Sequence, residues 1–288
     1  MTPHFAAYEA ESLETYRSAG GDVSHVEYYT APEEAQTRTK VPGAVAAYEW
    51  PAASSHPAKL AQFLLQFVVE RGVRLFTFCP VTGVSRNSSS SSSSGVCLWD
   101  VHTPRGIVST ENVIRCTNAH AALLLPSLEP FITPNRAQAH SLIPTSHFSG
   151  KNILQNTFSL RYSLHHFYSL IQRQQDGTLV LGVSRSNPTL SQETIDGQIS
   201  TDDTKYNEEI AQDALRNFGV IFPDSNVDIG SGAHMHGEGL DHVWTGIIAM
   251  TADSVPLVGE VEGLEGQFVC AGFNGHGKLS FSFPLPYS

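Results

Sequence analysis

The chain has 288 residues, of which 41% are hydrophobic and 16% are charged, and this composition is typical of a globular protein rather than a disordered one. The formal net charge of −11, with no cluster of Lys and Arg, argues against a nucleic-acid-binding or anionic-membrane surface. No apolar run approaches the ~20 residues of a membrane span, and the N-terminus lacks the features of a secretory signal, so we expect a cytoplasmic protein. The cysteines have no short paired spacing, which predicts reduced and mostly buried thiols at Cys79, Cys97, Cys116 and Cys270.

The first third of the chain predicts an αβ unit. Residues 5–18 form a short amphipathic helical pattern. A second helix is expected after a cap at Ser54, Ser55 or His56, with Pro57 in its first turn and Gly72 ending it. Apolar residues recur along this helix at helical spacing, and the segment 73–78 (VRLFTF) that follows is predicted to be a strand. Because a helix, a tight turn and a strand succeed one another, we expect an α/β domain.

Residues 88–94 are seven consecutive serines, flanked on both sides by strand-like segments. This composition predicts a solvated, inert hairpin loop. The segment 111–130 then predicts a strand, a turn at residues 117–119 and a helix.

Residues 158–185 alternate between apolar and polar side chains and contain the turn sequence QDGT, a pattern typical of a β-hairpin. In one alternating strand, Tyr162, His166 and Tyr168 share a face. That face is either a half-buried sheet surface with satisfied hydroxyls or the wall of a pocket.

A helix is expected within residues 201–223, capped by Asp202 or Asp203, with Glu208, Glu209 and Asp213 on its outer face. Residues 242–273 predict short strands joined by turns.

Several chemistries are excluded or disfavoured by motif. The chain has no G-x-S-x-G elbow and no phosphate loop of the G-x-x-x-x-G-K-[ST] kind, and GSGAHM lacks the third glycine of a dinucleotide fingerprint. His234, His236, Glu238 and His242 offer a loose metal-ligand spacing, but a loop with histidines in polar contacts is the better interpretation.

The stretch GFNGHGKLSF places glycines at 272, 275 and 277. Glycine is favoured where the backbone needs positive φ or where something comes very close to it. A strand at QFVCAG followed by FNGHG would lead, in many folds, to the start of a helix, whose outward N–H groups favour a ligand atom that gains electron density. The alternative is an ordinary turn near the C-terminus.

Four segments taken together resemble one family. They are GVRLFTFCPVTGV, VHTPRGIVSTENVIRCTNAHAALLLPSL, TPNRAQAHSLIP and WTGIIAMTADSVPLVGEVEGLEGQFVCAGFNGHG. The chain resembles FAD-dependent oxidoreductases of the D-amino-acid oxidase, glycine oxidase and sarcosine oxidase type, most closely a fungal branch, from about residue 41 to residue 277. This resemblance implies an α/β (α+β) fold. A partial Rossmann-like FAD-binding domain (residues 1–129 and 241–288) would accompany an antiparallel-sheet substrate domain (residues 130–240).

The resemblance also implies site residues. Tyr162, His166 and Tyr168 would line the substrate pocket, and His276 is the remaining candidate catalytic residue. The implied FAD-binding residues are Val81, Thr117, Asn118, Ala119, Trp244, Gly246, Asp253, Gly272, Phe273, Asn274, Gly275, His276 and Gly277. The family reaction oxidises a C–N bond of a small amine or amino acid by hydride transfer to the flavin, with oxygen as the usual final acceptor.

Three departures from the family pattern stand out. The chain has no G-x-G-x-x-G loop, so we expect that it is truncated and lacks the first βαβ unit of the FAD-binding domain. Ile247 and Ile248 stand where amino-acid oxidases of the family place a carboxylate-binding Arg, which disfavours an ordinary amino-acid substrate unless Arg136 or Arg161 supplies the charge. The tail KLSFSFPLPYS contains Pro284 and Pro286, so it cannot form the family's closing helix and is expected to be altered. The alternative to an active enzyme is a catalytically inactive fragment that cannot hold FAD, with exposed apolar surface and poor solubility.

Overall fold

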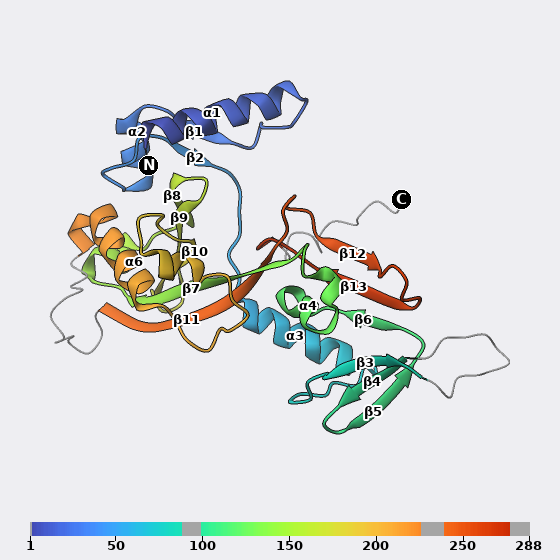
Figure 1. Ribbon diagram of the computed structural model, residues 1–288. Helices are drawn as coiled ribbons and strands as arrows, with labels where there is room; N and C mark the ends of the chain where they lie inside the picture. The colour runs from blue at the N-terminus through green and yellow to red at the C-terminus, as the bar shows by residue number, and fades with distance from the viewer. Residues whose placement is uncertain (1, 88–98, 226–238, 277–288) are drawn as a thin grey trace. The chain divides into compact units, whose positions relative to one another are not determined.

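The structure is a computed structural model that describes residues 2–87, 99–225 and 239–276 (Figure 1). The chain divides into two compact units. Unit 1 comprises residues 1–54, 137–198 and 203–246, and unit 2 comprises residues 55–136, 199–202 and 247–288. Residues 1–54, which were expected with the FAD-binding part, therefore belong to the same unit as the segment 137–198. The mixed α/β architecture with antiparallel sheets is confirmed.

Unit 1 is built on a five-stranded sheet of order β11-β7-β10-β9-β8, beside a small antiparallel pair, β1-β2. Two strands, β7 and β11, cross the boundary between the units. The helices and strands are α1 (Pro3–Ser18), β1 (Glu27–Tyr29), α2 (Pro32–Thr39), β2 (Ala47–Glu49), β7 (Thr133–Ile143), β8 (Phe158–Ser163), β9 (His166–Gln172), β10 (Leu179–Arg185), α5 (Gln192–Asp196), α6 (Glu208–Ile221) and β11 (Gly239–Met250).

Helix α6 contributes much of the core of unit 1, where it contacts β10. The Phe218 ring on α6 lies 5.8 Å from the Phe148 ring and 5.2 Å from the Phe222 ring, centroid to centroid. The helix is confirmed, but its predicted cap is wrong. Asn207 caps it, because its side-chain oxygen accepts a hydrogen bond from the Ile210 amide at 3.0 Å.

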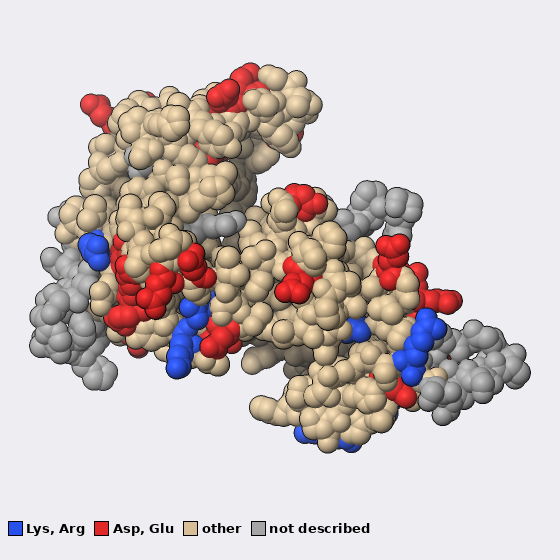
Figure 2. Space-filling model, in the orientation of Figure 1, with Lys and Arg blue, Asp and Glu red and all other residues tan. Residues whose placement is uncertain are grey.

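The predicted outer face of α6 is also wrong in one position. Asp213 is 3% exposed, on the same face as Ile210 and Ala214. A position three or four residues from a buried one shares its face, and a buried carboxylate is tolerated where donors surround it. The acidic first turn, Glu208 and Glu209, agrees with the acidic side chains that gather over the α6 region in Figure 2.

Unit 2 holds two three-stranded sheets, β12-β13-β6 and β3-β4-β5. The β13–β6 pairing is parallel, and Ala119, Ile132, Ala249 and Val269 contribute to a core at this sheet. Its helices and strands are α3 (Pro57–Val69), β3 (Gly83–Arg86), β4 (Trp99–Thr103), β5 (Gly106–Thr110), β6 (Val113–Arg115), η1 (Asn118–His120), α4 (Ala121–Leu124), η2 (Pro126–Leu128), β12 (Leu257–Glu260) and β13 (Gln267–Ala271). The predicted strand, turn and helix in 111–130 are confirmed.

The strands on either side of the serine run pair with each other. β3 and β4 are antiparallel, with Arg86 opposite Trp99, so the predicted hairpin is confirmed. The serine run itself lies outside the described residues.

Helix α3 begins as predicted, with His56 at the N-cap and Pro57 in the first turn, but it has no buried residue. Six of its large apolar side chains are at least 42% exposed: Leu60, Phe63, Leu64, Leu65, Phe67 and Val69. The strand predicted at 73–78 is wrong, because no described strand lies beside this segment to pair with it. Phe78 has a φ of 52°, and its side chain is 95% exposed.

No helix within residues 2–87, 99–225 and 239–276 is long and apolar enough to cross a membrane.

A pair of phenylalanines tests the exposure of α3. Phe63 is 64% exposed and Phe218 is 0% exposed. We expect Phe63→Gln to change the free energy of unfolding by less than about 0.5 kcal/mol and to raise the soluble yield. Phe218→Ala, the matched core change, is expected to cost about 3–5 kcal/mol. Urea unfolding of both variants provides the measurement, and an equal cost at the two positions would contradict the exposure of α3.

Candidate functional site

The two parallel strands β6 and β13 end beside each other in unit 2, and both lead into turns with positive φ. A side-chain contact joins the two strands. Arg115, the last residue of β6, is 7% exposed and donates two hydrogen bonds, of 3.1 and 2.5 Å, to the side-chain oxygen of Gln267, the first residue of β13. Asn118 follows β6 with φ of 48°, and its Oδ1 accepts hydrogen bonds from the Gly272 amide at 3.0 Å and the Phe273 amide at 3.5 Å. One asparagine therefore fixes the start of the glycine loop.

A second asparagine fixes the loop from inside. Asn274 has φ of 51°, its Oδ1 accepts from the Thr251 amide at 2.8 Å, and its Nδ2 donates to Thr251 Oγ1 at 2.9 Å and to the Gly272 carbonyl at 2.6 Å. Gly272 has φ of 76°, and a Cβ there would lie 2.7 Å from Thr251 Cγ2. Asparagine tolerates left-handed backbone, and glycine is required where both the φ and the close neighbour exclude a side chain.

Gly275 is different from its neighbours in the loop. It has φ of 83°, it is exposed, and nothing lies within 4 Å of a Cβ placed on it. The amides of Gly272, Asn274 and His276 donate within the protein, whereas the Gly275 amide has no partner in the described part of the chain. The loop thus presents one open amide donor on a backbone that is held in place.

The other predicted cofactor residues of unit 2 vary in position. Ala119 is 4% exposed and packs in the same core as Ala271, whereas Thr117 is exposed. Asp253 is exposed, and the hydrogen bond it accepts from the Val255 amide lowers the pKa of its carboxyl. Val81 is 39% exposed in the irregular segment before β3, and Gly277 lies outside the described residues.

The predicted pocket residues of unit 1 come together, although not in one strand. β8 ends at Ser163 and β9 starts at His166, so a turn at residues 164–165 breaks the single alternating strand that the sequence suggested. The hairpin still brings the rings together. Tyr162 stacks on His166 at 4.7 Å between centroids, and His166 Nε2 lies 3.2 Å from the Tyr168 hydroxyl.

Tyr168 connects this group to a buried carboxylate. Its hydroxyl donates to Asp213 Oδ2 at 2.7 Å, and Asp213 Oδ1 accepts from Asn187 Nδ2 and from Asn217 Nδ2, each at 3.1 Å. Tyr168 is 1% exposed, and burial followed by the Asp213 hydrogen bond raises the pKa of its hydroxyl. Tyr168 is therefore more deeply buried than His166 and positions its ring through the contact with His166 Nε2.

The same bonds determine the tautomer of His166. Because the single Tyr168 proton points to Asp213, the hydroxyl oxygen accepts from His166, whose Nε2 carries the proton. Burial lowers the pKa of His166 and so favours the neutral ring, while the charge of Asp213 has a smaller, opposite effect. Its Nδ1 is then a lone-pair acceptor on a half-buried surface.

The remaining predicted residues lie in β11. Trp244 is 40% exposed and stacks on His242 at 5.8 Å, and nothing lies within 4 Å of a Cβ placed on Gly246. Both belong to unit 1, whereas the glycine loop belongs to unit 2. His234, His236 and Glu238 lie outside the described residues, and the described ones contain no group of three possible metal ligands.

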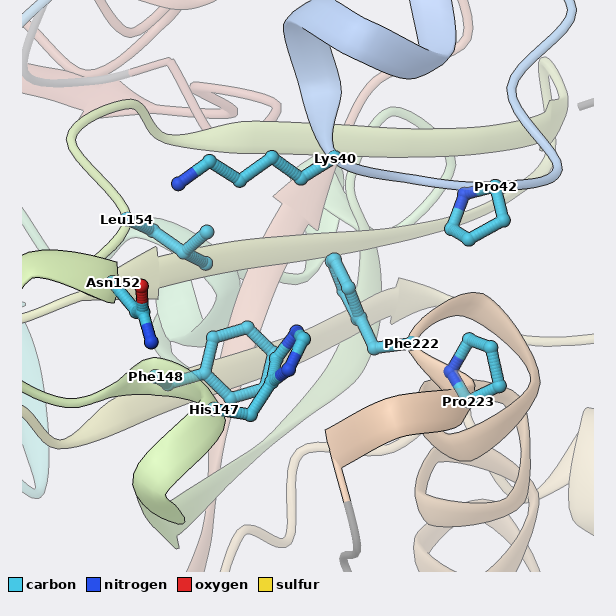
Figure 3. Close-up of a pocket in the computed structure, with 8 residues that line it drawn as sticks. All are labelled: Lys40, Pro42, His147, Phe148, Asn152, Leu154, Phe222 and Pro223. Carbon is cyan, nitrogen blue, oxygen red and sulfur yellow. The ribbon is translucent and has the colours of Figure 1, made fainter.

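Unit 1 also contains a hollow of about 260 Å³ that sequence reasoning missed (Figure 3). The Lys40 side chain extends along one side of it, and the rings of Phe148 and Phe222 face it. Segments far apart in the sequence supply these residues, so no local pattern signals the hollow. None of the predicted site residues lines it.

A comparison with protein families gives one match. The model of the family described as "FAD dependent oxidoreductase" matches residues 3–281. The chain belongs to this family. No match was found among curated proteins.

The fold of the chain is similar to that of several solved structures. Glycine oxidase from Geobacillus kaustophilus has a TM-score of 0.70 and 18% identity, with 97% of this chain and 65% of that chain covered. L-proline dehydrogenase from P. horikoshii has a TM-score of 0.63 and 21% identity, with 88% and 60% covered. A modified fructosyl peptide oxidase from Aspergillus nidulans has a TM-score of 0.67 and 16% identity, with 96% and 65% covered. The chain thus spans less than two thirds of the length of these proteins.

The family is FAD-dependent, and the loop residues fit an FAD at one point. Gly275 combines an open amide donor with free space, which suits the close approach of a planar ring that accepts a hydrogen bond. The side chains of Asn118 and Asn274 are engaged within the loop, so they support the backbone and do not themselves reach outward.

The Tyr168–Asp213 bond is testable with a matched pair of tyrosines. Tyr168→Phe removes a hydrogen bond to a charged acceptor and is expected to cost about 1.5–3 kcal/mol in the free energy of unfolding. Tyr162→Phe serves as the control, because the Tyr162 hydroxyl makes no hydrogen bond to any of the described residues, and we expect a change below about 0.5 kcal/mol. Urea unfolding at pH 7 measures both, and indistinguishable variants would contradict the assigned bond.

One buried and one half-buried histidine, His140 and His166, predict acid sensitivity. His140 is 0% exposed, its Nε2 accepts from Gln138 Nε2 at 3.0 Å, its Nδ1 donates to the Leu181 carbonyl at 3.0 Å, and burial lowers its pKa. The pKa of His166 is lowered as well. Since both folded-state values lie below the unfolded value of 6.5, the unfolded chain binds more protons and stability is lost as the pH falls below it.

We expect the free energy of unfolding to fall between pH 7 and pH 5, by at most about 1.4 kcal/mol per pH unit for each histidine. His166→Gln should reduce this slope. A slope that is the same in the variant and in the unsubstituted protein would refute the assignment of His166.

Proposed function

We propose that this chain forms part of a flavoenzyme that oxidises a C–N bond of a small amine or amino acid, with oxygen as the final electron acceptor. The observation that carries the proposal is the glycine loop, which two asparagines hold with the Gly275 amide open. The family match over residues 3–281 supports the cofactor assignment.

The residues that would contact FAD are the loop residues from Gly272 to His276, with Gly277 after them. When bound, FAD would accept a hydride from the substrate carbon that carries the nitrogen. The Gly275 amide would donate a hydrogen bond to an acceptor atom of the ring, and a donor fixed in advance needs no reorganisation during the reaction. Asn118 and Asn274 would hold that amide in place. Additional contacts are proposed for Val81, Thr117, Ala119, Trp244, Gly246 and Asp253.

Unit 1 would serve as the substrate domain and unit 2 as the cofactor domain. His166 Nδ1 would accept a proton from the substrate ammonium, because only a neutral amine has the lone pair that drives hydride loss. Tyr168 and Asp213 would keep His166 in the required tautomer, and Tyr162 would cover the other face of its ring. His276, exposed next to Gly275, is a second candidate proton acceptor.

The substrate class rests on a departure from the family pattern. Ile247 and Ile248 follow Gly246, so this stretch supplies no guanidinium for a carboxylate. A substrate without a free α-carboxylate therefore fits best. The similar structures are a glycine oxidase, an L-proline dehydrogenase and a fructosyl peptide oxidase, so amines with different substituents are reasonable compounds for screening.

One observation favours the alternative, that this chain does not hold FAD by itself. Helix α3 has no buried residue, and a helix that is apolar on most sides is normally covered on more than one of them. A covering element absent from the described residues would then be needed before the cofactor domain is complete.

An absorption spectrum separates the two proposals. The purified chain is incubated with FAD, desalted and scanned, and retained bands near ~450 nm support a cofactor-binding chain. Peroxide detection with a panel of amines and amino acids then tests the reaction. A colourless protein with a cooperative melting transition would favour the alternative.

The role of the loop predicts a specific variant. Asn118→Ala removes the acceptor for the Gly272 and Phe273 amides, and we expect FAD affinity to fall at least tenfold, about 1.4 kcal/mol. Asn156→Ala is the control, because Asn156 is exposed in unit 1 and bonds to Glu49. Fluorescence titration with FAD measures both, and equal affinities would count against the loop as the cofactor site.

A further inference from the structure

Two cysteines far apart in the sequence meet in unit 2. In the parallel pairing of β13 with β6, which are side by side in Figure 1, Val269 is opposite Arg115. The next residues in the chain are Cys270, within β13, and Cys116, directly after the end of β6. The register therefore brings the two thiols together, and the neighbouring Cys116 adds to the effect of burial in raising the pKa of the Cys270 thiol.

The position suits a disulfide. Neighbouring strands lie about 4.8 Å apart, within the Cα separation of about 4.4–6.8 Å that a disulfide spans. Residues in register on adjacent strands direct their side chains to the same face of the sheet, and Cys116 and Cys270 are one residue beyond the Arg115–Val269 pair.

The two thiols differ in accessibility in a way that suits stepwise oxidation. Cys116 is exposed and both cysteines are free thiols, whereas Cys270 is half-buried. The exposed sulfur is available to an oxidant from solvent, and the half-buried one is held next to it. Sites with an accessible thiol beside a resolving thiol are typical of reversible redox chemistry.

We propose that Cys116 and Cys270 form a reversible redox-modification site that hydrogen peroxide oxidises to a disulfide. The Cys116 thiolate attacks peroxide, the O–O bond breaks, an S–O bond forms, and the sulfenic acid and one water result. The Cys270 sulfur then attacks the Cys116 sulfur, the S–O bond breaks, and the second water leaves. Two electrons pass from the thiol pair to the peroxide, and both thiol hydrogens end in water.

The disulfide would act on the ends of both strands at once. Asn118 and Gly272, which hydrogen-bond at 3.0 Å, each follow one of the two cysteines by two residues. A covalent link at 116–270 therefore constrains the same strand ends that carry the glycine loop. The expected consequence is a more stable unit 2 in the oxidised state, because the link restricts the unfolded chain. This inference does not depend on FAD binding.

Peptide mapping after peroxide treatment tests the site. The purified chain is titrated with hydrogen peroxide, the remaining thiols are blocked, and the protein is digested without reductant and analysed by mass spectrometry. We expect a cross-linked peptide pair that contains Cys116 and Cys270, the loss of two of the four thiols, and full recovery with dithiothreitol. The midpoint of urea unfolding should be higher in the oxidised protein.

Single variants provide the controls. Cys116→Ser should abolish the cross-link and the rise in the unfolding midpoint, whereas Cys79→Ser, which changes a different free cysteine, should leave both unchanged. Mapping of the unsubstituted protein decides the question even if Cys116→Ser folds poorly. Sulfinic acid at Cys116 without any link to Cys270, or a link from Cys116 to another cysteine, would overturn the proposal.

Discussion

The parallel pairing of β6 with β13 is the constraint on which unit 2 depends. It joins two strands that are distant in the sequence, and the buried Arg115–Gln267 contact holds the pair together. Beyond the strand ends, where the two backbones no longer pair, the Asn118 side chain accepts a hydrogen bond from the Gly272 amide and keeps the two segments joined. Because the Gly272 and Phe273 amides donate to Asn118 Oδ1, groups of the protein itself hold the start of the glycine loop. The proposed cofactor contact and the proposed redox pair both rest on this one pairing.

Unit 1 is organised by buried polar side chains within an apolar core. Asp213 accepts hydrogen bonds from Tyr168, Asn187 and Asn217, which connects α6 to the sheet. Gln172 has a similar role, since it accepts from the Leu154 amide at 2.8 Å and donates to the Phe148 carbonyl at 2.8 Å. Buried networks of this kind are favourable only when every member is satisfied, so they select one arrangement of the segments. The position of His166 at the end of the Asp213 network is a consequence of that selection.

Local signals predicted local structure well. The His56–Pro57 start of α3, the helix at 208–221 and the turn before β10 follow from caps, periodicity and a glycine with φ of 74° at position 177. The errors arose where a partner outside the segment decides the outcome. The segment 73–78 has strand-forming residues, but no strand in the described part of the chain pairs with it. Asp213 has the pattern of a surface residue, but Tyr168 and two asparagines surround it. The turn at 164–165 was missed because the alternation of side chains continues through it.

The sequence by itself determined the family, through the order of its motifs, and the positions of most helices and turns, because capping, periodicity and glycine placement act over a few residues. It also identified the glycine loop and the rings of Tyr162, His166 and Tyr168 as candidate sites. Only the tertiary structure decided which of these groups hydrogen-bond: that Asn118 holds Gly272, that Tyr168 donates to Asp213, and that Cys116 lies beside Cys270. The physical reason is that hydrogen bonds and thiol contacts act over a few ångströms, and residues distant in the chain come within that range only when the strands pair.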